Sequence, residues 1–412
     1  MEDQSNSATQ AATLPRRNHF LIILILGALS TVTPFSIDFY LPAFPQLALA
    51  LNSSPAKIAL TLSSYFIGLS IGQLFYGPLL DRFARKKPLA LGLILYLIAT
   101  FVCLSAKSCE TLIYLRFLQA LGGCVAQVAS IAMVRDFFPV KEGAKVFSLL
   151  TLILGVSPLL APTIGGFVVS AYGWEAIFML LFGVVATILL VSMIFLPEGH
   201  ASDPTVSLKP KSILAGFWEV LRHPQFYTYA LATAFSFAGL FVYVAGSPII
   251  FMNVFRVSAK IYGLIFAFLS IGVIGGSQVN ILLNRKYSSE GLFKAALMAQ
   301  VGFGILFLLF AYFNLLGLSS TIAFLFLILW CLGITSPNGS ALALAPFSKN
   351  AGRASALIGF LQMGAGALAS TGVGLLNART VLPIVSILLA GCMLGLLVLL
   401  IGEDSVMGGV TH

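Results

Sequence analysis

Residues 176–196 read AIFMLLFGVVATILLVSMIFL, and this stretch contains no charged side chain. A helix of about 20 apolar residues is as long as the ~30 Å hydrocarbon layer of a membrane is thick. The whole chain has the same character. Of its 412 residues, 59% are hydrophobic and only 9% are charged, and its mean hydropathy is +1.00. Because a soluble globular protein carries about 25% charged residues, this composition excludes a soluble enzyme and predicts a helical membrane protein.

Eleven further apolar stretches of similar length occur in the chain. The twelve predicted spans are residues 20–44, 57–80, 88–106, 110–135, 145–170, 174–197, 224–252, 260–283, 290–314, 319–344, 353–377 and 380–402. We therefore predict an all-α integral membrane protein with twelve transmembrane helices in two six-helix bundles. Its parts are an N-terminal tail (1–19), a first bundle (20–197), a polar central loop (198–223), a second bundle (224–402) and a C-terminal tail (403–412).

The placement of Lys and Arg predicts the orientation. With a cytoplasmic N-terminus, 17 of the 23 Lys and Arg residues fall in cytoplasmic segments and five fall in external loops. Basic residues are enriched on the cytoplasmic side of membrane proteins, so we predict that both termini are cytoplasmic. The net charge of +9 then reflects this asymmetry beside an anionic leaflet, and we expect a lipid bilayer as partner and no nucleic acid. The five cysteines form no CxxC pattern, so we expect free buried thiols and no metal site.

The two predicted bundles resemble each other in sequence. Leu79–Arg82 (LLDR) ends the second span, and Leu282–Arg285 (LLNR) ends the eighth. Glycines four residues apart occur in the same two spans, at Gly68 and Gly72 and at Gly272 and Gly276. Such glycines let helix backbones approach closely. This internal repeat predicts two bundles around a cavity at the middle of the membrane, the arrangement that transporters use for alternating access.

Two of the 37 charged side chains, Asp38 and Arg116, fall deep inside predicted spans. A charge there costs at least ~2.5–3.5 kcal/mol, so it needs a reason. The four histidines lie outside the spans, which leaves Asp38 as the best intramembrane proton acceptor. A carboxyl group favours its protonated form in a dry cavity and its charged form near water or a cation. Two interpretations stay open, because Asp38 could carry the coupling proton or could cap a helix end near the outer mouth.

The Arg116 guanidinium cannot lose its proton, so it must face the bundle interior and find acceptors such as Asp38, backbone carbonyls or Gln119. It either tunes the proton site or ties helices together. At the predicted cytoplasmic side, Asp81 and Arg85 lie four residues apart, with Arg82 between them. Together with Asp136 they predict a cytoplasmic gate that holds the outward-open form. We favour Asp81 and Arg85 for this latch, and the alternative for the whole cluster is topology anchoring.

A substrate cavity should be mostly apolar with a few polar groups. The first, fourth, seventh and tenth spans should supply much of its lining. Candidates are Tyr40, Gln119, Gln127, Phe237, Phe241, Tyr243, Trp330, Asn338 and Gln362. For any single aromatic residue, packing is the alternative; the amides are better candidates, because an unpaired amide in hydrocarbon is costly. With no second intramembrane carboxylate, neutral or weakly polar substrates are expected.

Several motifs resemble those of the major facilitator superfamily, and more closely those of its Bcr/CflA group of drug:proton antiporters. The resemblance covers about residues 18–402. The loop GPLLDRFARKK (77–87) is similar to the superfamily's loop motif, with Ala84 in place of a glycine. The fourth-span motif matches at LIYLRFLQALG (112–122), with Ala120 in place of glycine. The narrower group is indicated by IDFYLPAFP (37–45), YVAGSP (243–248) and GRASALIGFLQM (352–363).

The fifth span is similar to the antiporter motif, with GVSP at 155–158 and APTIGG at 161–166, where Ala161 replaces a glycine. Pro158 and Pro162 remove backbone donors and kink the helix, while Gly165 and Gly166 permit close packing. The resemblance implies that this helix is a barrier to proton leak; simple packing is the alternative. It also implies proton-driven export of small hydrophobic antibiotics from the bacterial inner membrane, with the proton as coupling ion and no bound cofactor.

Other functions are weighed against this one. The same carrier could export an endogenous metabolite or siderophore, and the sequence does not separate the two cargoes. A membrane enzyme would need a catalytic cluster, and no His lies beside Asp38 inside a span. ATP drive is not expected, because the chain contains no GxxxxGK[ST] motif. A channel or receptor is not favoured, because no filter-like loop or extramembrane ligand domain is found. We expect a monomer that takes a small drug-like molecule.

Overall fold

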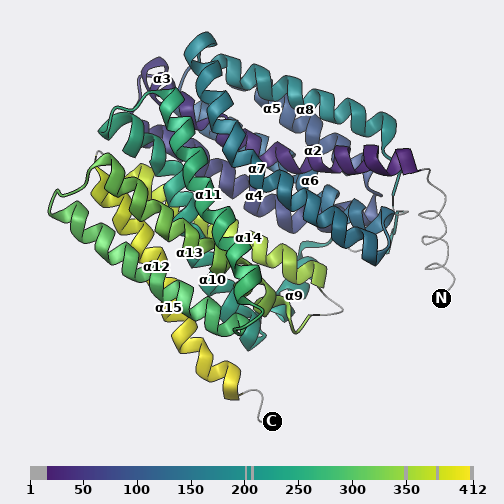
Figure 1. Ribbon diagram of the computed structural model, residues 1–412. Coiled ribbons are helices and arrows are strands. Elements are labelled where there is room, and N and C mark those ends of the chain that lie inside the picture. The colour runs from purple at the N-terminus through teal and green to yellow at the C-terminus, as the bar shows by residue number, and fades with distance from the viewer. Residues whose placement is uncertain (1–15, 200–201, 206–207, 348–350, 377–379, 409–412) are drawn as a thin grey trace.

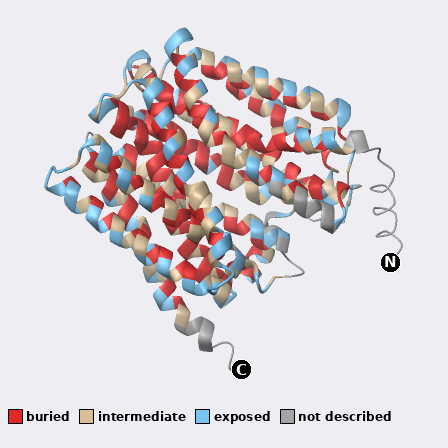
Figure 2. Ribbon diagram, viewed as in Figure 1, coloured by how far each residue is buried: buried red, intermediate tan, exposed pale blue. Residues whose placement is uncertain are grey.

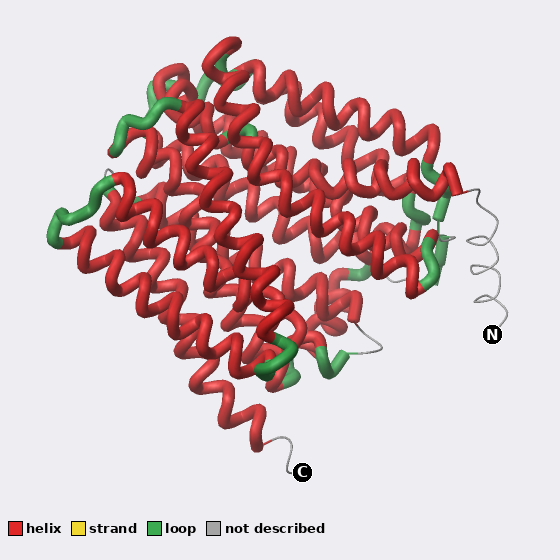
Figure 3. Tube along the Cα trace, viewed as in Figure 1, coloured by secondary structure: helices red, strands yellow, loops and turns green. Residues whose placement is uncertain are grey.

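The computed structural model describes residues 16–199, 202–205, 208–347, 351–376 and 380–408. Every regular element in these residues is helical, and twelve helices are long and apolar enough to cross a membrane (Figures 1 and 3). The first bundle comprises α2 (Arg16–Asp38), α4 (Pro55–Arg82), α5 (Lys86–Cys103), α6 (Cys109–Phe137), α7 (Val140–Tyr172) and α8 (Glu175–Phe195). The second comprises α10 (Pro224–Pro248), α11 (Ala259–Leu283), α12 (Ser289–Tyr312), α13 (Leu318–Leu344), α14 (Ala351–Leu375) and α15 (Val381–Gly408). The prediction of twelve spans is confirmed.

Prolines set two helix ends that bear on function. Helix α2 ends at Asp38 and is followed by a 3₁₀ turn, η1 (Leu41–Ala43), and by the short α3 (Phe44–Ala50). Pro42 and Pro45 lack the backbone N–H that a continuing α-helix would use. The predicted first span ran on to residue 44, and the helix stops before that. Helix α10 passes after Pro248 into a π-helix, η2 (Ile249–Val254).

The central segment contains a helix that the sequence analysis treated only as polar loop. Helix α9 (Pro210–Leu221) packs against α10 and α14 of the second bundle. Its Phe217 and Val220 side chains are buried there, in a cluster with Phe226 and Leu357. The signal in the sequence is a twelve-residue amphipathic stretch beside charged residues, which is shorter than the ~20 residues of a membrane span.

Glycine packing confirms the internal repeat. In the first bundle, a Cβ atom on Gly68 of α4 would lie 2.6 Å from the Phe117 carbonyl oxygen of α6. In the second bundle, Gly276 of α11 packs in the same way on the backbone of Trp330 of α13. The second helix of each bundle therefore touches the fourth at backbone distance, which only a residue without a side chain permits.

The bundles meet mainly through two helix pairs, α4 with α14 and α7 with α11. Between α4 and α14, Ser370 Oγ donates to Ser63 Oγ at 2.9 Å and Ser70 Oγ donates to the Phe360 carbonyl at 3.0 Å. Figure 1 shows the bundles meeting at the end opposite the chain termini and diverging toward the end where α2 begins and α15 ends. We call these ends the far side and the terminal side. Buried residues gather at the centre, and exposed ones line the outermost helices (Figure 2).

Candidate functional site

Arg116 lies at the centre of the first bundle, and its side chain is fully buried. Its Nη1 donates to Gln119 Oε1 at 2.5 Å, and its Nη2 donates to the Ser36 carbonyl of α2 at 2.9 Å. Gln119 Nε2 in turn donates to Thr100 Oγ1 of α5 at 2.7 Å. The predicted acceptors Gln119 and a backbone carbonyl are thus both found. A guanidinium that holds α2, α5 and α6 together in this way is a fixed cation within the bundle.

Two tyrosine rings complete the surroundings of this cation. The Arg116 Cζ atom lies 4.4 Å from the ring centroid of Tyr40 and 4.3 Å from that of Tyr65. A desolvated cation between aromatic faces gains ~2 kcal/mol or more from each good contact. Tyr40 also shares a hydrogen bond of 2.8 Å with Thr61 Oγ1. We call Ser36, Tyr40, Tyr65, Arg116 and Gln119 the Arg116 cluster. Tyr40 and Gln119, predicted as cavity residues, belong to it, with their polar groups bonded inside the first bundle.

Among the described residues, Arg116 has no carboxylate partner, so the predicted alternative acceptor Asp38 does not pair with it. The Arg116 Nε atom is buried and has no hydrogen-bond partner in the described chain. The reason for the separation is geometric. The Ser36 carbonyl accepts from Arg116, whereas Asp38, two residues further along α2, interacts electrostatically with Tyr243 and Tyr262 of the second bundle.

Asp38 is the last residue of α2, and its side chain is 5% exposed. It is the one acidic residue that is buried in the described chain. It interacts electrostatically with the phenol groups of Tyr243 in α10 and Tyr262 in α11. The Tyr262 hydroxyl shares a hydrogen bond of 2.8 Å with Ser247 Oγ, but the buried Tyr243 hydroxyl has no partner among the described residues. Asp38 therefore lies where the first bundle faces the second, next to an unused hydroxyl.

The second bundle has a buried polar centre that the sequence analysis missed. Ser236 Oγ of α10 donates to Gln300 Oε1 of α12 at 2.7 Å and lies 3.2 Å from Thr335 Oγ1 of α13. Gln300 is an intramembrane amide, so the cost argument that selected Gln119 and Asn338 could have found it. Gln300 lies in the ninth predicted span, whereas most of the predicted cavity lining was assigned to the first, fourth, seventh and tenth spans.

An ion triad lies on the terminal side of the first bundle. Arg85 Nη1 donates to Asp81 Oδ1 at 2.6 Å, and Arg85 Nε and Nη2 donate to the two carboxylate oxygens of Asp136 at 2.7 and 3.3 Å. Burial disfavours the charged guanidinium, but the hydrogen bonds to Asp136 and Asp81 outweigh it, so the pKa of Arg85 is raised above its usual range. The structure thus brings together three predicted gate residues. Asp136, which the sequence analysis favoured less, makes the two-pronged contact; Arg82 instead lies over the ring of its neighbour Phe83.

The central segment closes over this triad. Gly199 has a positive φ of 77°, and a Cβ atom there would lie 2.9 Å from Arg85 Cγ and 3.1 Å from Asp136 Oδ2. The Asp203 N–H donates to the Asp81 carbonyl at 3.2 Å. The segment that follows α8 therefore covers Arg85 and Asp136, while the Asp81 side chain stays 55% exposed. All three side chains of the triad belong to the first bundle, and the triad is formed here while the bundles meet on the far side.

The paired glycines of α7 touch two different neighbours. A Cβ atom on Gly165 would lie 2.7 Å from the Phe39 carbonyl oxygen, next to Asp38 in the chain, and one on Gly166 would lie 2.5 Å from the Ala259 carbonyl oxygen of α11. Pro158 and Pro162 lie inside the same helix. The predicted close packing is confirmed, and it places α7 against both the end of α2 and the second bundle.

The other predicted cavity residues take three kinds of position. Phe241 packs against Phe66 of α4 across the two bundles, with ring centroids 4.3 Å apart, and against Phe237 of α10. Asn338 is buried and donates to Asn280 Oδ1 at 2.6 Å, while it accepts from Asn284 Nδ2 at 3.1 Å. Partly exposed positions belong to Gln127, Trp330 and Gln362.

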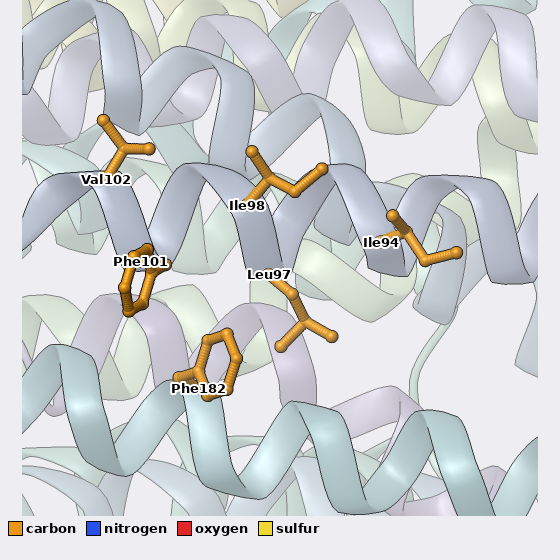
Figure 4. Close-up of a pocket in the computed structure, with 6 residues that line it drawn as sticks. All are labelled: Ile94, Leu97, Ile98, Phe101, Val102 and Phe182. Atoms are coloured by element: carbon orange, nitrogen blue, oxygen red, sulfur yellow. The ribbon is translucent and has the colours of Figure 1, made fainter.

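A hollow on the outer surface is unrelated to these groups. It lies between α5 and α8, and Figure 4 shows its lining, which is entirely apolar: Ile94, Leu97, Ile98, Phe101, Val102 and Phe182. Phe101 and Phe182 face each other across it, with ring centroids 6.1 Å apart. Because both helices lie on the outside of the first bundle, this hollow faces the predicted lipid and not the second bundle.

Comparison with known proteins gives consistent relatives. A bicyclomycin resistance protein homolog of Haemophilus influenzae is 32% identical over 373 residues, which are 89% of this chain and 92% of that protein. The multidrug resistance protein MdtL of Escherichia coli is 29% identical over 82% of this chain and 84% of its own length. Solved structures of the same fold include a D-xylose-proton symporter (TM-score 0.70, 16% identity, 93% and 97% of the two chains) and the nucleoside transporter NupG (TM-score 0.71, 13% identity, 93% and 99%).

The family model described as Major Facilitator Superfamily matches residues 24–370, which is most of the chain. This agrees with the twelve helices, the repeat between the bundles and the ion triad that Asp81 and Arg85 of the loop motif form with Asp136 of α6. The chain belongs to the Major Facilitator Superfamily, and it is a multi-pass membrane transporter rather than an enzyme.

Proposed function

We propose that this chain is a proton-coupled multidrug efflux transporter, an antiporter that exports small hydrophobic antibiotics by alternating access. The observation that carries the proposal is Asp38, buried at the interface between the bundles and without an ion-pair partner among the described residues. Its surroundings can change when the bundles move, because Tyr243 and Tyr262 belong to the other bundle. A carboxyl group whose surroundings differ between two states can bind a proton in one and release it in the other.

The fixed charge of Arg116 supports this role for Asp38. Since Arg116 is held by Gln119 and the Ser36 carbonyl, it does not neutralise the carboxyl permanently. A permanent pair would oppose protonation, and Arg116 makes no such pair with Asp38. In this proposal the far side is periplasmic, the terminal side and both termini are cytoplasmic, and the membrane is the inner membrane of a bacterium.

The energy supply is sufficient for export. One proton that enters down ~100 mV releases ~2.3 kcal/mol, which sustains roughly a fiftyfold gradient of a neutral drug. The proton is the coupling ion, with no bound cofactor, and the transporter works as a monomer. The drug cargo rests on the resistance functions named for its relatives, together with the apolar surroundings of Phe66 and Phe241 at the interface. Export of an endogenous metabolite or siderophore is the second candidate, because the same coupling geometry would serve it.

Drug susceptibility separates the two cargoes. An efflux-deficient bacterial host with the wild-type chain should resist a set of small hydrophobic antibiotics that inhibit the host with an empty vector. Unchanged susceptibility to every drug, with the protein present in the membrane, would favour the metabolite exporter.

The Asp38→Asn variant tests the coupling. It should reach the membrane in wild-type amounts and lose uncoupler-sensitive efflux, because an amide cannot exchange a proton. The matched control is Glu290→Gln, a carboxyl group that is exposed at the start of α12. Efflux by Asp38→Asn at the wild-type rate, abolished by an uncoupler as before, would disprove the role of Asp38.

A further inference from the structure

Helix α9 in the central segment carries an exposed stripe of mixed character. Lys211, Leu214, Trp218 and Arg222 follow one another at intervals of three and four residues, which places them on one side of the helix. Leu214 is 61% exposed and Trp218 is 55% exposed. We call these four residues the α9 stripe. Its centre is apolar, and a basic residue stands at each end.

The opposite side of α9 is already occupied. Phe217 and Val220 are buried in the cluster that contains Phe226 of α10 and Leu357 of α14. This packing fixes the rotation of α9 about its axis, so the α9 stripe must point away from the second bundle. Helix α9 therefore has two apolar surfaces. One is buried against the second bundle, and the other, with Leu214 and Trp218, is exposed and available to a binding partner.

The chemistry of the stripe fits the boundary between lipid and water. Tryptophan is enriched at this boundary, and basic side chains keep their apolar stems in the lipid while their charges reach the headgroups. The Arg222 guanidinium lies over the Trp218 ring, with Cζ 5.3 Å from the centroid, so the cation and the ring act as one unit. Glu219, the acidic residue of α9, lies beside the stripe and not in it.

The position of α9 in the chain also indicates that it lies at the boundary between lipid and water. It lies between α8 and α10, two helices that cross the membrane, and it packs at the start of α10 and α14 on the terminal side. Arg353 of α14 adds a further cation next to α9, because a Cβ atom on Gly216 would lie 3.3 Å from Arg353 Nη1. The basic residues therefore gather at the level where membrane-spanning helices end, which is where lipid headgroups lie.

We propose that α9 is an interfacial helix that binds anionic lipid, with Leu214 and Trp218 inserted below the headgroups and Lys211 and Arg222 in contact with their phosphates. The basic pair supplies charge complementarity to an anionic leaflet. The apolar pair supplies the depth that distinguishes a lipid from a free phosphate ion. This inference concerns the resting protein in its membrane, and it does not depend on the transported substrate.

Tryptophan fluorescence tests the proposal directly, since the chain contains only three tryptophans. In the full-length Trp174→Phe/Trp330→Phe variant, Trp218 is the sole reporter. The protein is reconstituted into vesicles of phosphatidylethanolamine that contain increasing fractions of brominated phosphatidylglycerol in one series and of brominated phosphatidylcholine in the other. Brominated chains quench a tryptophan only when it lies in the lipid. We expect both lipids to quench Trp218. The fraction of phosphatidylglycerol that gives half-maximal quenching should be lower than that of phosphatidylcholine, by roughly fivefold for each of the two basic residues of the stripe.

Charge variants separate headgroup binding from simple insertion. In the same background, Lys211→Gln/Arg222→Gln should remove the preference for the anionic lipid and keep the quenching. The matched control Arg285→Gln/Lys286→Gln, an exposed basic pair on the same side after α11, should keep the preference. Absence of quenching by either lipid would overturn the proposal, because the stripe would then face water or protein. Equal quenching by both lipids before any charge is removed would overturn the anionic-lipid site.

Discussion

The interiors of the two bundles differ in charge. The buried charged side chains of the described chain are Asp38, Arg85 and Arg116, and all three belong to the first bundle. The buried polar groups of the second bundle are neutral. In the first bundle, Arg116 of α6 connects to Ser36 of α2 and, through Gln119, to α5. On the corresponding helices of the second bundle, α13, α10 and α12, Thr335, Ser236 and Gln300 make a network without charge.

The same contrast occurs on the terminal side. The repeat aligns Asp81 of α4 with Asn284, the residue that follows α11. Asp81 binds a guanidinium that also binds α6, whereas Asn284 donates to Asn338 of α13 at 3.1 Å. In each bundle the end of the second helix is thus connected to the fourth helix. The connection is made by ion pairs in the first bundle and by an amide hydrogen bond in the second.

This difference separates two tasks that a transporter must combine. Protonation changes the net charge of a carboxyl group but cannot change an amide at physiological pH. A neutral hydrogen-bonded interior also avoids the cost of charge in hydrocarbon. The first bundle therefore contains the groups that can respond to protons or hold charge. The second bundle supplies a neutral surface that includes Tyr243. When the bundles move relative to each other, the contact of Asp38 with this surface changes.

The largest effect is expected from removing the charge at the centre of the first bundle. Arg116→Ala should lower transport roughly tenfold or more, because hydrogen bonds to a charged group of ~1.5–3 kcal/mol are lost where the coupling geometry is set. The measurement is drug efflux from cells with matched protein levels. Gln300→Ala in the neutral network and Arg256→Ala at the surface should retain most of the activity. Equal mild losses in all three variants would contradict a special role for the charged centre.

The ion triad should dominate the stability of the terminal side. Arg85→Ala removes the guanidinium that binds Asp136, whose side chain is only 14% exposed, so we expect a loss of about 3 kcal/mol in the free energy of unfolding. Thermal unfolding in detergent measures it, with the exposed Lys87→Ala as control. A value as small as that of the control would mean that the triad is a solvated surface pair.

The amide contact at Asn338 in the second bundle should contribute less to the free energy of unfolding than the ion triad. Asn338→Ala removes hydrogen bonds to Asn280 and Asn284, and neutral hydrogen bonds between membrane helices contribute ~0.6 kcal/mol on average. We expect a loss of about 1 kcal/mol in the same unfolding experiment. The contrast between the bundles fails if Asn338→Ala is more damaging than Arg85→Ala.

The smallest change in stability is expected at Tyr243. Its hydroxyl has no hydrogen-bond partner among the described residues, so Tyr243→Phe removes no bond and should alter the unfolding free energy by less than ~0.5 kcal/mol. The dependence of efflux on external pH should nevertheless shift, because Asp38 loses a polar neighbour. Tyr262→Phe, which breaks the bond to Ser247, is the matched variant that should cost stability. An unchanged pH profile for Tyr243→Phe would show that the Tyr243 hydroxyl does not influence the protonation of Asp38.

Much of the fold followed from the sequence, because a membrane imposes a length on each span and a cost on each charge. These constraints act on one segment at a time, so the twelve helices, the repeat and the isolation of Asp38 and Arg116 were all predictable. Asp81 and Arg85 could also be paired from the sequence, because they lie only four residues apart, although α4 ends at Arg82 and Ala84 turns the chain with a φ of 61°. Gln119 is likewise only three residues from Arg116.

The tertiary structure decided how each helix is rotated and which distant segments meet. Ser36 and Asp38 lie two residues apart at the end of α2, yet one contacts Arg116 and the other faces Tyr243 and Tyr262. The aromatic rings around Arg116 and the cover that Gly199 forms over the triad depend on the same packing. Hydropathy places a residue at a depth in the membrane, but it carries little information about the direction of a side chain around the helix axis. That direction depends on contacts between helices that are far apart in the sequence.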